Sequence, residues 1–295
     1  MKRICIAISS NDKDTTMHLE IYAPEYKGDL KGLIQICHGM TEYMGRYVEF
    51  AKYFTSADTL SLAMTSSATD TAPHQDHPVC TLMTGTTQLK IWYQQGNMLS
   101  GNTQTCLSIF WDFLWGSFIV RTNADLTPYK KEILIGTGAQ SAFLMRIMRT
   151  WIGKKYTGKM SCASDKIYDL MFGTYGKKFK GRPANYWLLT DNEKRREYAD
   201  DSLVRQDVSP AFFCEFSKGM ECASRNLKNP NNTIPTLFLY GKKRSRYPVL
   251  EKASERYIKH TKKTTRIRRS EAFPELTISC MTPDMNRYLR QSPII

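Results

Sequence analysis

Short continuous runs of apolar residues in this chain alternate with stretches in which apolar residues recur every three or four positions, the spacing of a helix. Residues 4–8 and 17–22 flank a polar turn and alternate apolar and polar side chains, which predicts an antiparallel hairpin. Residues 32–37 form an apolar strand that ends in a glycine turn, and residues 47–54 then have helical spacing. The order of strand, glycine turn and helix is typical of α/β folds.

The alternation of strand and helix patterns continues along the chain. We predict further strands at residues 60–63, 107–111, 132–135, 236–240 and 265–268, and helices at residues 82–95, 117–122, 251–260 and 285–289. Because these strands alternate with helices, we expect a mostly parallel central sheet flanked by helices.

One long segment does not show this alternation of strands and helices. Residues 138–232 have helical spacing, starting near Phe143, and contain many aromatic side chains. We interpret this segment as an inserted helical cap. The chain then divides into a first core part at residues 1–137, the cap at residues 138–232, and a second core part at residues 233–295.

Composition restricts the class of protein. The chain has 295 residues, of which 41% are hydrophobic, enough for one large α/β domain with an elaboration. No apolar stretch reaches the roughly 20 residues that a membrane-spanning helix needs, and the N-terminus does not resemble a secretory leader. The eight cysteines form no C-x-x-C pair, which argues against a zinc site or a redox dithiol. We expect a soluble cytoplasmic protein with reduced, mostly buried thiols and no cofactor.

The charge is strongly basic. The formal net charge is +14, with basic clusters at residues 242–246 and 259–269. Such clusters favour contact with an anionic membrane surface or with nucleic acid. No helix-turn-helix, RNA-recognition or zinc-finger pattern accompanies them, so a solvated basic face is the better interpretation and nucleic-acid binding is not the expected main function.

The order of the predicted elements and several short sequence segments of this chain resemble those of a known family. Residues 31–47, KGLIQICHGMTEYMGRY, resemble the strand and oxyanion loop of monoacylglycerol lipase and lysophospholipase-like α/β-hydrolases. Shorter phrases follow in the family's order at residues 116–119, 136–138 and 172–179. The resemblance covers nearly the whole chain. It implies an α/β-hydrolase fold with an inserted helical cap and a lipid-like or acyl-ester ligand.

The family's chemistry requires a serine nucleophile, an acid and a histidine, and this chain lacks all three at the matching positions. The nucleophile elbow G-x-S-x-G reads DFLWG here, with Leu114 in place of the serine. The resemblance assigns Arg244 to the acid and Pro274 to the histidine. Leucine cannot attack a carbonyl, arginine has the wrong charge to orient an imidazole, and proline is neither base nor acid. Of the oxyanion hole, the backbone N–H groups of Met40 and Trp115 remain.

Other reactive side chains do not replace this triad. His38 resembles a residue that supports the oxyanion loop. His74 and His77 flank one carboxylate in a polar loop, without a third convergent metal ligand. We interpret His260 as a solvated residue at a helix end and Ser117 as a hydroxyl that points into the sheet. Cys106 and Cys280 are interpreted as thiols in the core.

Three functions therefore compete. The first is a catalytically impaired scaffold that binds a lipid-like ligand, an acyl ester or a protein partner. The second is a working carboxylic-ester hydrolase on monoacylglycerol or lysophospholipid, as the resemblance implies if the catalytic residues lie elsewhere. The third is a basic module for anionic lipid or nucleic acid. The substitutions at Leu114, Arg244 and Pro274 favour the first.

Overall fold

The structure is a computed structural model. It describes residues 1–9, 16–25, 32–39, 43–56, 59–66, 106–111, 131–135, 137, 141–177, 180–183, 186, 188–189, 191–204, 208–226, 235–241 and 267–273.

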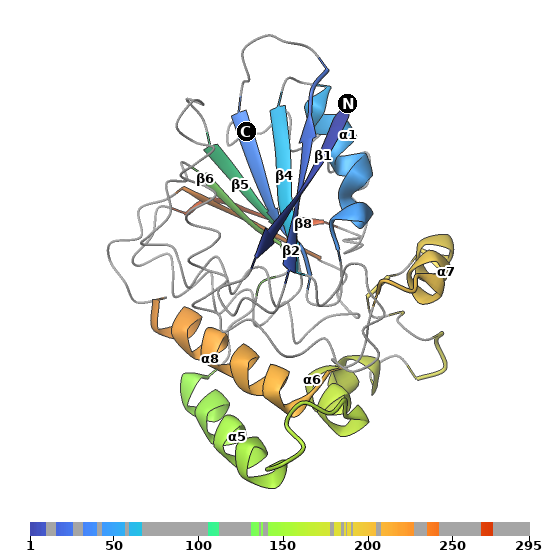
Figure 1. The fold of residues 1–295 in the computed structure, drawn as a ribbon. Coiled ribbons are helices and arrows are strands. Elements are labelled where there is room, and N and C mark those ends of the chain that lie inside the picture. The colour runs from blue at the N-terminus through green and yellow to red at the C-terminus, as the bar shows by residue number, and fades with distance from the viewer. Residues whose placement is uncertain are drawn as a thin grey trace.

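A central sheet organises the described residues (Figure 1). Its eight strands follow the order β1-β2-β4-β3-β5-β6-β7-β8. The strands are β1 Lys2–Ser9, β2 Thr16–Ala23, β3 Gly32–Cys37, β4 Thr59–Ser66, β5 Cys106–Trp111, β6 Lys131–Ile135, β7 Thr236–Gly241 and β8 Ile267–Phe273. β1 and β2 form an antiparallel hairpin, β2 pairs antiparallel with β4, and all pairings among β3 to β8 are parallel.

The predicted hairpin and the parallel sheet are thereby confirmed, and β3 has the predicted bounds. The last strand was predicted too early, at residues 265–268. β8 instead runs Ile267–Phe273, because its pairing with β7 shifts between Thr236 and Leu237 and then continues to the Gly241–Phe273 pair. The helices predicted at residues 82–95, 117–122, 251–260 and 285–289 lie outside the described residues.

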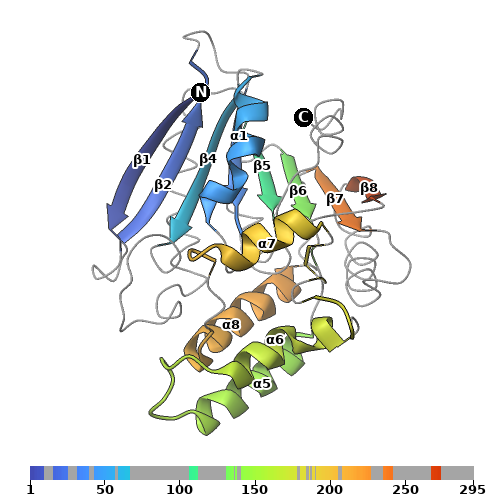
Figure 2. The ribbon, with the colours of Figure 1, turned by 90° about the vertical axis from the view of Figure 1, so that its right-hand side faces the viewer.

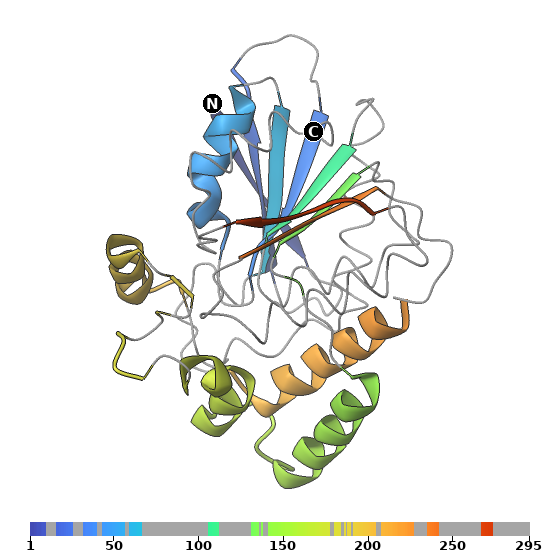
Figure 3. The same ribbon diagram turned by 180° about the vertical axis from the view of Figure 1, so that it is seen from behind.

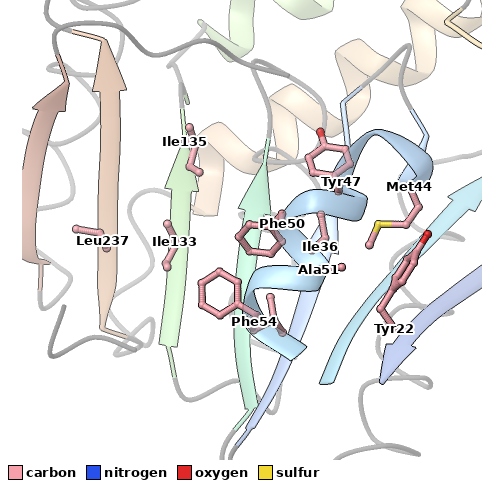
Figure 4. Packing of buried hydrophobic residues seen from close by; sticks show 11 residues of the cluster. Tyr22, Ile36, Met44, Tyr47, Phe50, Ala51, Phe54, Ile133, Ile135 and Leu237 are labelled. Carbon is pink, nitrogen blue, oxygen red and sulfur yellow. The ribbon is translucent and has the colours of Figure 1, made fainter. Parts of the chain in front are cut away.

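Helix α1 covers one face of the sheet. A short 3-10 turn, η1 Met44–Tyr47, leads into α1 Val48–Thr55, so the helix predicted at residues 47–54 is confirmed. Phe50 and Phe54 lie one turn apart on the same side of α1. They pack against alternate residues of the strands, as Figure 4 shows, in a cluster that includes Ile34, Ile36, Ile133, Ile135 and Leu237.

Among the described residues between β6 and β7 there are four helices: α5 Ala142–Lys155, α6 Asp165–Lys177, α7 Asn192–Asp200 and α8 Pro210–Asn226. We call them the helical layer. Side-chain oxygens cap two of these helices: Ser141 accepts from the Leu144 amide at 3.4 Å, and Asp191 accepts from the Lys194 amide at 2.9 Å. No helix in the described part of the chain is both long enough and apolar enough to cross a membrane.

The helical layer lies beyond the carboxyl ends of the parallel strands. In Figure 2 the arrowheads of β4, β5, β6 and β7 point toward it. Figures 1 and 3 both show α8 between the sheet and α5, so α5 is the outermost element at this end of the molecule. A second apolar core joins α5, α6 and α8, with Ile152, Ile167 and Phe213 among its buried side chains. The layer therefore has its own hydrophobic contacts.

Candidate functional site at the carboxyl edge of the sheet

The site predicted from the sequence begins where β3 ends. All six residues of β3 are buried, and His38, directly after it, is only 8% exposed. The His38 Nδ1 atom lies 2.7 Å from the carbonyl oxygen of Gly39. Because a carbonyl only accepts hydrogen bonds, Nδ1 carries the proton and donates it. His38 thus braces the turn after β3, as the sequence led us to expect.

The loop after this turn is joined to the helical layer through one carboxylate. Tyr43 Oη donates to Asp201 Oδ2 at 2.9 Å, and Arg46 Nη1 lies 3.5 Å from the same oxygen. The other oxygen of Asp201 accepts from the Leu203 amide at 2.9 Å. The side chains of Arg46 and Asp201 are 8% and 18% exposed, so the pair is largely shielded from water.

Two neighbouring contacts strengthen this connection. The Arg46 guanidinium lies 4.9 Å from the centre of the Tyr198 ring, which belongs to α7 and is buried. Gly45 lies under the Tyr43 ring, so that a Cβ atom at Gly45 would overlap the ring. A glycine is therefore needed for Tyr43 to reach Asp201. The segment around Arg46 carries the family resemblance, but the sequence alone gave no role to Tyr43, Arg46 or Asp201.

Three sequence segments, called windows here, contain the positions that the resemblance assigns to the triad: Leu114, Arg244 and Pro274. Each window begins at the carboxyl end of a parallel strand. β5 ends at Trp111, three residues before Leu114. β7 ends at Gly241, three residues before Arg244, and β8 ends directly before Pro274. Leu114, Arg244 and Pro274 themselves lie outside the described residues, as do Met40 and Trp115.

The register shows how close these strand ends are. Trp111 pairs with Ile135 of β6, Ile135 pairs with Leu239 of β7, and Gly241 pairs with Phe273 of β8. Neighbouring strands lie about 4.8 Å apart, so the ends of β5, β7 and β8 span about 15 Å of one sheet edge. In open α/β sheets ligands bind outside the carboxyl ends of the strands, which is where the three windows begin.

The described residues contain few other candidates. His74, His77, His260, Ser117 and Cys280 lie outside them, and Cys106 is the first residue of β5. Among the described cysteines, Cys37 and Cys214 are buried whereas Cys5 and Cys162 are exposed, so the expectation of mostly buried thiols is only partly met. No group of three His, Cys, Asp or Glu side chains in the described ranges is arranged to hold a metal ion.

Two buried carboxylates in the sheet were missed by the sequence analysis. Glu20 is 2% exposed and accepts from Tyr22 Oη at 2.7 Å and from Arg3 Nε at 2.9 Å. Burial, reinforced by the hydrogen bond to Glu20, raises the pKa of Tyr22 well above its ordinary value. Glu132, near the amino end of β6, accepts from Thr236 Oγ1 at 2.8 Å. Both side chains lie within the sheet, and neighbouring residues donate hydrogen bonds to their carboxylates. This indicates structural roles for both.

A third buried carboxylate joins two helices of the helical layer. Glu221 on α8 accepts from Arg149 at 3.0 Å and from Arg225 at 2.6 Å, and also binds Arg146. The hydrogen bonds from Arg146, and then from Arg149 and Arg225, outweigh the cost of burial and lower the pKa of Glu221 to about 2. The sequence offered no signal for this cluster, because Glu221 is more than 70 residues from Arg146 and Arg149.

Comparison with known proteins rests on structure, since no family model and no curated protein matches the sequence. A lipase in its open form superposes with a TM-score of 0.79 at 14% identity, over 98% of this chain and 97% of that chain. A thermostable carboxyl esterase from Bacillus coagulans, in complex with glycerol, gives 0.75 at 15% identity, over 92% and 90%. A soluble variant of the monoglyceride lipase of Saccharomyces cerevisiae, in complex with a substrate analogue, gives 0.69 at 10% identity, over 98% and 92%. The chain therefore has the α/β-hydrolase fold that these three proteins share.

Proposed function

We propose that this chain is a catalytically impaired relative of the monoacylglycerol lipases that holds a lipid-like or acyl-ester ligand. The observation that supports this most directly is the topology. The windows that contain Leu114, Arg244 and Pro274 start at the carboxyl ends of β5, β7 and β8, in one region of one sheet edge. A serine hydrolase of this fold needs a nucleophile, an acid and a histidine at this edge.

The proposal includes a cap at residues 138–232 between two core parts, residues 1–137 and 233–295. The position of α5 to α8 beyond the strand ends supports it (Figure 2). The bond from Tyr43 to Asp201 would hold this cap against the loop that contains Met40. The proposal assigns what remains of an oxyanion hole to the backbone N–H groups of Met40 and Trp115.

The names of the similar structures support the ligand class that we propose. Of the similar structures, one is a yeast monoglyceride lipase in complex with a substrate analogue, and another is a Bacillus coagulans carboxyl esterase in complex with glycerol. We therefore propose a monoacylglycerol or lysophospholipid as the ligand. The cytoplasmic location and the absence of a cofactor remain predictions from the sequence.

The test restores the three groups together. We expect wild-type protein to hydrolyse a nitrophenyl ester about a millionfold more slowly than an active serine esterase, because losing a triad that acts as a unit lowers turnover by about this factor. The variant Leu114→Ser/Arg244→Asp/Pro274→His should gain hydrolysis that depends on the new serine, and reverting that serine to alanine is the matched control. A variant that folds but gains nothing would refute the assignment of the three windows.

The second candidate function, a working ester hydrolase, is distinguished by the same assay. Wild-type turnover of a monoacylglycerol well above background would establish it and overturn the impaired scaffold. Binding of a nonhydrolysable monoalkylglycerol ether, measured by calorimetry, tests the ligand class separately from turnover. Saturable binding is expected, whereas its absence would remove this ligand class.

A further inference from the structure

Three arginines converge on one carboxylate where helix α5 packs along helix α8 (Figures 1 and 3). Glu221 Oε1 accepts from Arg146 Nε at 3.2 Å and from Arg225 Nη2 at 2.6 Å. The other oxygen, Oε2, accepts from Arg149 Nη2 at 3.0 Å. Because all three guanidiniums bind the two oxygens of one carboxylate, they lie close to one another. We call Arg146, Arg149 and Arg225 the arginine cluster.

The arginine cluster carries more charge than Glu221 offsets. The pKa of Glu221 is lowered to about 2, first by the hydrogen bond from Arg146, so its carboxylate is charged near neutral pH. Three cations around one anion leave a net charge of +2. The sequence around the cluster adds no second acid. Residues 133–164 contain no Asp or Glu, and Glu221 is the only one in residues 216–250.

The guanidiniums keep hydrogen-bond donors that Glu221 does not use. Each guanidinium has five N–H groups, and only one or two nitrogens of each bind Glu221. The side chains of Arg146 and Arg225 are 60% and 67% exposed, so the donors that remain on them face solvent. Arg149 is only 23% exposed, and its Nη1 atom has no hydrogen-bond partner. The cluster thus offers two solvent-facing guanidiniums above a shielded third.

An anion at this position would complete the cluster. Guanidiniums this close repel one another, and one carboxylate offsets only part of that repulsion. An anion between Arg146 and Arg225 would reduce it and would accept from their unused donors. The planar guanidinium matches the oxygens of a phosphate with two parallel hydrogen bonds. A phosphate monoester carries nearly two negative charges at neutral pH, which equals the net charge of the cluster, whereas a diester carries one.

We propose that the arginine cluster binds a phosphomonoester dianion at the surface between α5 and α8. Arg146 and Arg225 are its direct ligands. Glu221 is a positioning residue, because it holds both guanidiniums on the same side of the helix pair. A small soluble phosphomonoester and the headgroup of a lipid phosphomonoester share this chemistry. The proposal concerns the surface of the helical layer and does not rest on ester hydrolysis.

The first test compares a monoester with a diester. Full-length wild-type protein is titrated by calorimetry with glycerol 3-phosphate and with dimethyl phosphate, at an ionic strength held constant with chloride. We expect one saturable site for glycerol 3-phosphate with a Kd of about 1 mM. Dimethyl phosphate should bind about tenfold more weakly or not at all, because it carries one charge less. The absence of saturable binding, or equal affinity for the two esters, would overturn the proposal.

The second test removes the two direct ligands one at a time. Arg146→Gln and Arg225→Gln should each weaken binding of glycerol 3-phosphate by about tenfold, the effect of losing a hydrogen bond between charged groups. Lys154→Gln is the matched control, since it removes one exposed positive charge from α5 at a distance from Glu221 along the helix. It should bind as wild type does. Equal weakening in all three variants would assign binding to net charge and overturn the proposal, as would wild-type affinity in both arginine variants.

A vesicle experiment identifies the source of the phosphate. Wild-type protein and Arg225→Gln, both shown to be folded by circular dichroism, are pelleted with phosphatidylcholine vesicles that contain a small fraction of lysophosphatidic acid. Pelleting of wild type that Arg225→Gln loses would support a lipid phosphomonoester as the ligand. Binding of glycerol 3-phosphate without pelleting would support a soluble one. Pelleting that Arg225→Gln retains, with no binding of glycerol 3-phosphate by wild type, would overturn the proposal.

Discussion

Tyr43 and Asp201 are 158 residues apart in the sequence, yet the Tyr43 hydroxyl donates to the Asp201 carboxylate at 2.9 Å. Tyr43 belongs to the loop after β3, and Asp201 directly follows α7 of the helical layer. The same carboxylate also contacts Arg46, and the Arg46 guanidinium lies over the Tyr198 ring. One acidic side chain thus connects the sheet side of the molecule to the helical layer.

Removing this carboxylate should loosen the helical layer. Asp201→Ala leaves the mostly buried Arg46 without this counter-charge and removes the acceptor of Tyr43. We expect a loss of about 2 kcal/mol in the free energy of unfolding, with faster amide exchange in α7. Asp200→Ala, at the exposed neighbouring residue, is the control and should change neither. An Asp201→Ala protein as stable as wild type would show that the contact contributes nothing.

Replacing Gly45 tests the same connection from the loop side. Gly45→Ala would place a Cβ atom against the Tyr43 ring and displace it from Asp201. Combined with Asp201→Ala, it should cost less than the sum of the two single changes, because both act on one contact. Denaturant unfolding of the two single variants and the double variant measures this coupling. Fully additive losses would argue that Gly45 has no part in positioning Tyr43.

The cluster around Glu221 should make stability depend on pH in the acidic range. Its pKa is lowered to about 2 in the folded protein, first by the hydrogen bond from Arg146. The stabilisation is therefore complete above the unfolded pKa of about 4.3 and is lost as the pH falls toward 2. Glu221→Gln should be less stable than wild type by about 2 kcal/mol at pH 7, less than for a fully buried pair because Arg146 and Arg225 are largely exposed.

The difference between wild type and Glu221→Gln should shrink steadily below pH 4. Glu197→Gln, which removes an exposed pair with Lys194, is the matched control and should show little of this effect. Urea unfolding at a series of pH values measures both variants. A constant difference from pH 7 to pH 2 would contradict the lowered pKa.

The hydrogen bond between Thr236 and Glu132 should stabilise the pairing of β6 with β7 near their amino ends. Thr236→Val keeps the shape of the side chain but removes the hydroxyl that donates to Glu132 at 2.8 Å. Loss of one bond to a buried carboxylate should cost about 1–3 kcal/mol in thermal or denaturant unfolding. Thr236→Ser retains the hydroxyl and should lose clearly less. Equal losses in both variants would mean that packing of the methyl group, and not the hydrogen bond, carries the effect.

Local patterns predicted the elements whose residues carry an unambiguous signal. β3 is a continuous apolar run and has the predicted bounds, because all six residues are buried on both faces of the sheet. β8 was placed too early, since its sequence IRRSEAF has little apolar content and its extent is set by backbone pairing with β7. The sequence of α7, NEKRREYAD, is likewise mostly polar. It has no periodic apolar residues from which a buried helix face could be predicted.

The candidate site shows the same division. The strand ends that carry the Leu114, Arg244 and Pro274 windows follow from local patterns and from the parallel order of the sheet. The bonds that connect distant segments, such as Tyr43 to Asp201 and Thr236 to Glu132, depend on the tertiary fold. They leave no mark in a single sequence, because each residue type is ordinary at its position.

Labelling with a fluorophosphonate probe, which reacts with activated serines of this fold, tests directly whether this chain lacks the serine nucleophile. Folded wild-type protein is incubated with the probe beside an active serine esterase, and both are analysed by intact mass and peptide mapping. We expect labelling of the esterase and none of this chain, because the proposed function places Leu114 at the nucleophile position. Stoichiometric labelling of one serine in the folded wild-type chain would show a working nucleophile and refute the proposed impairment.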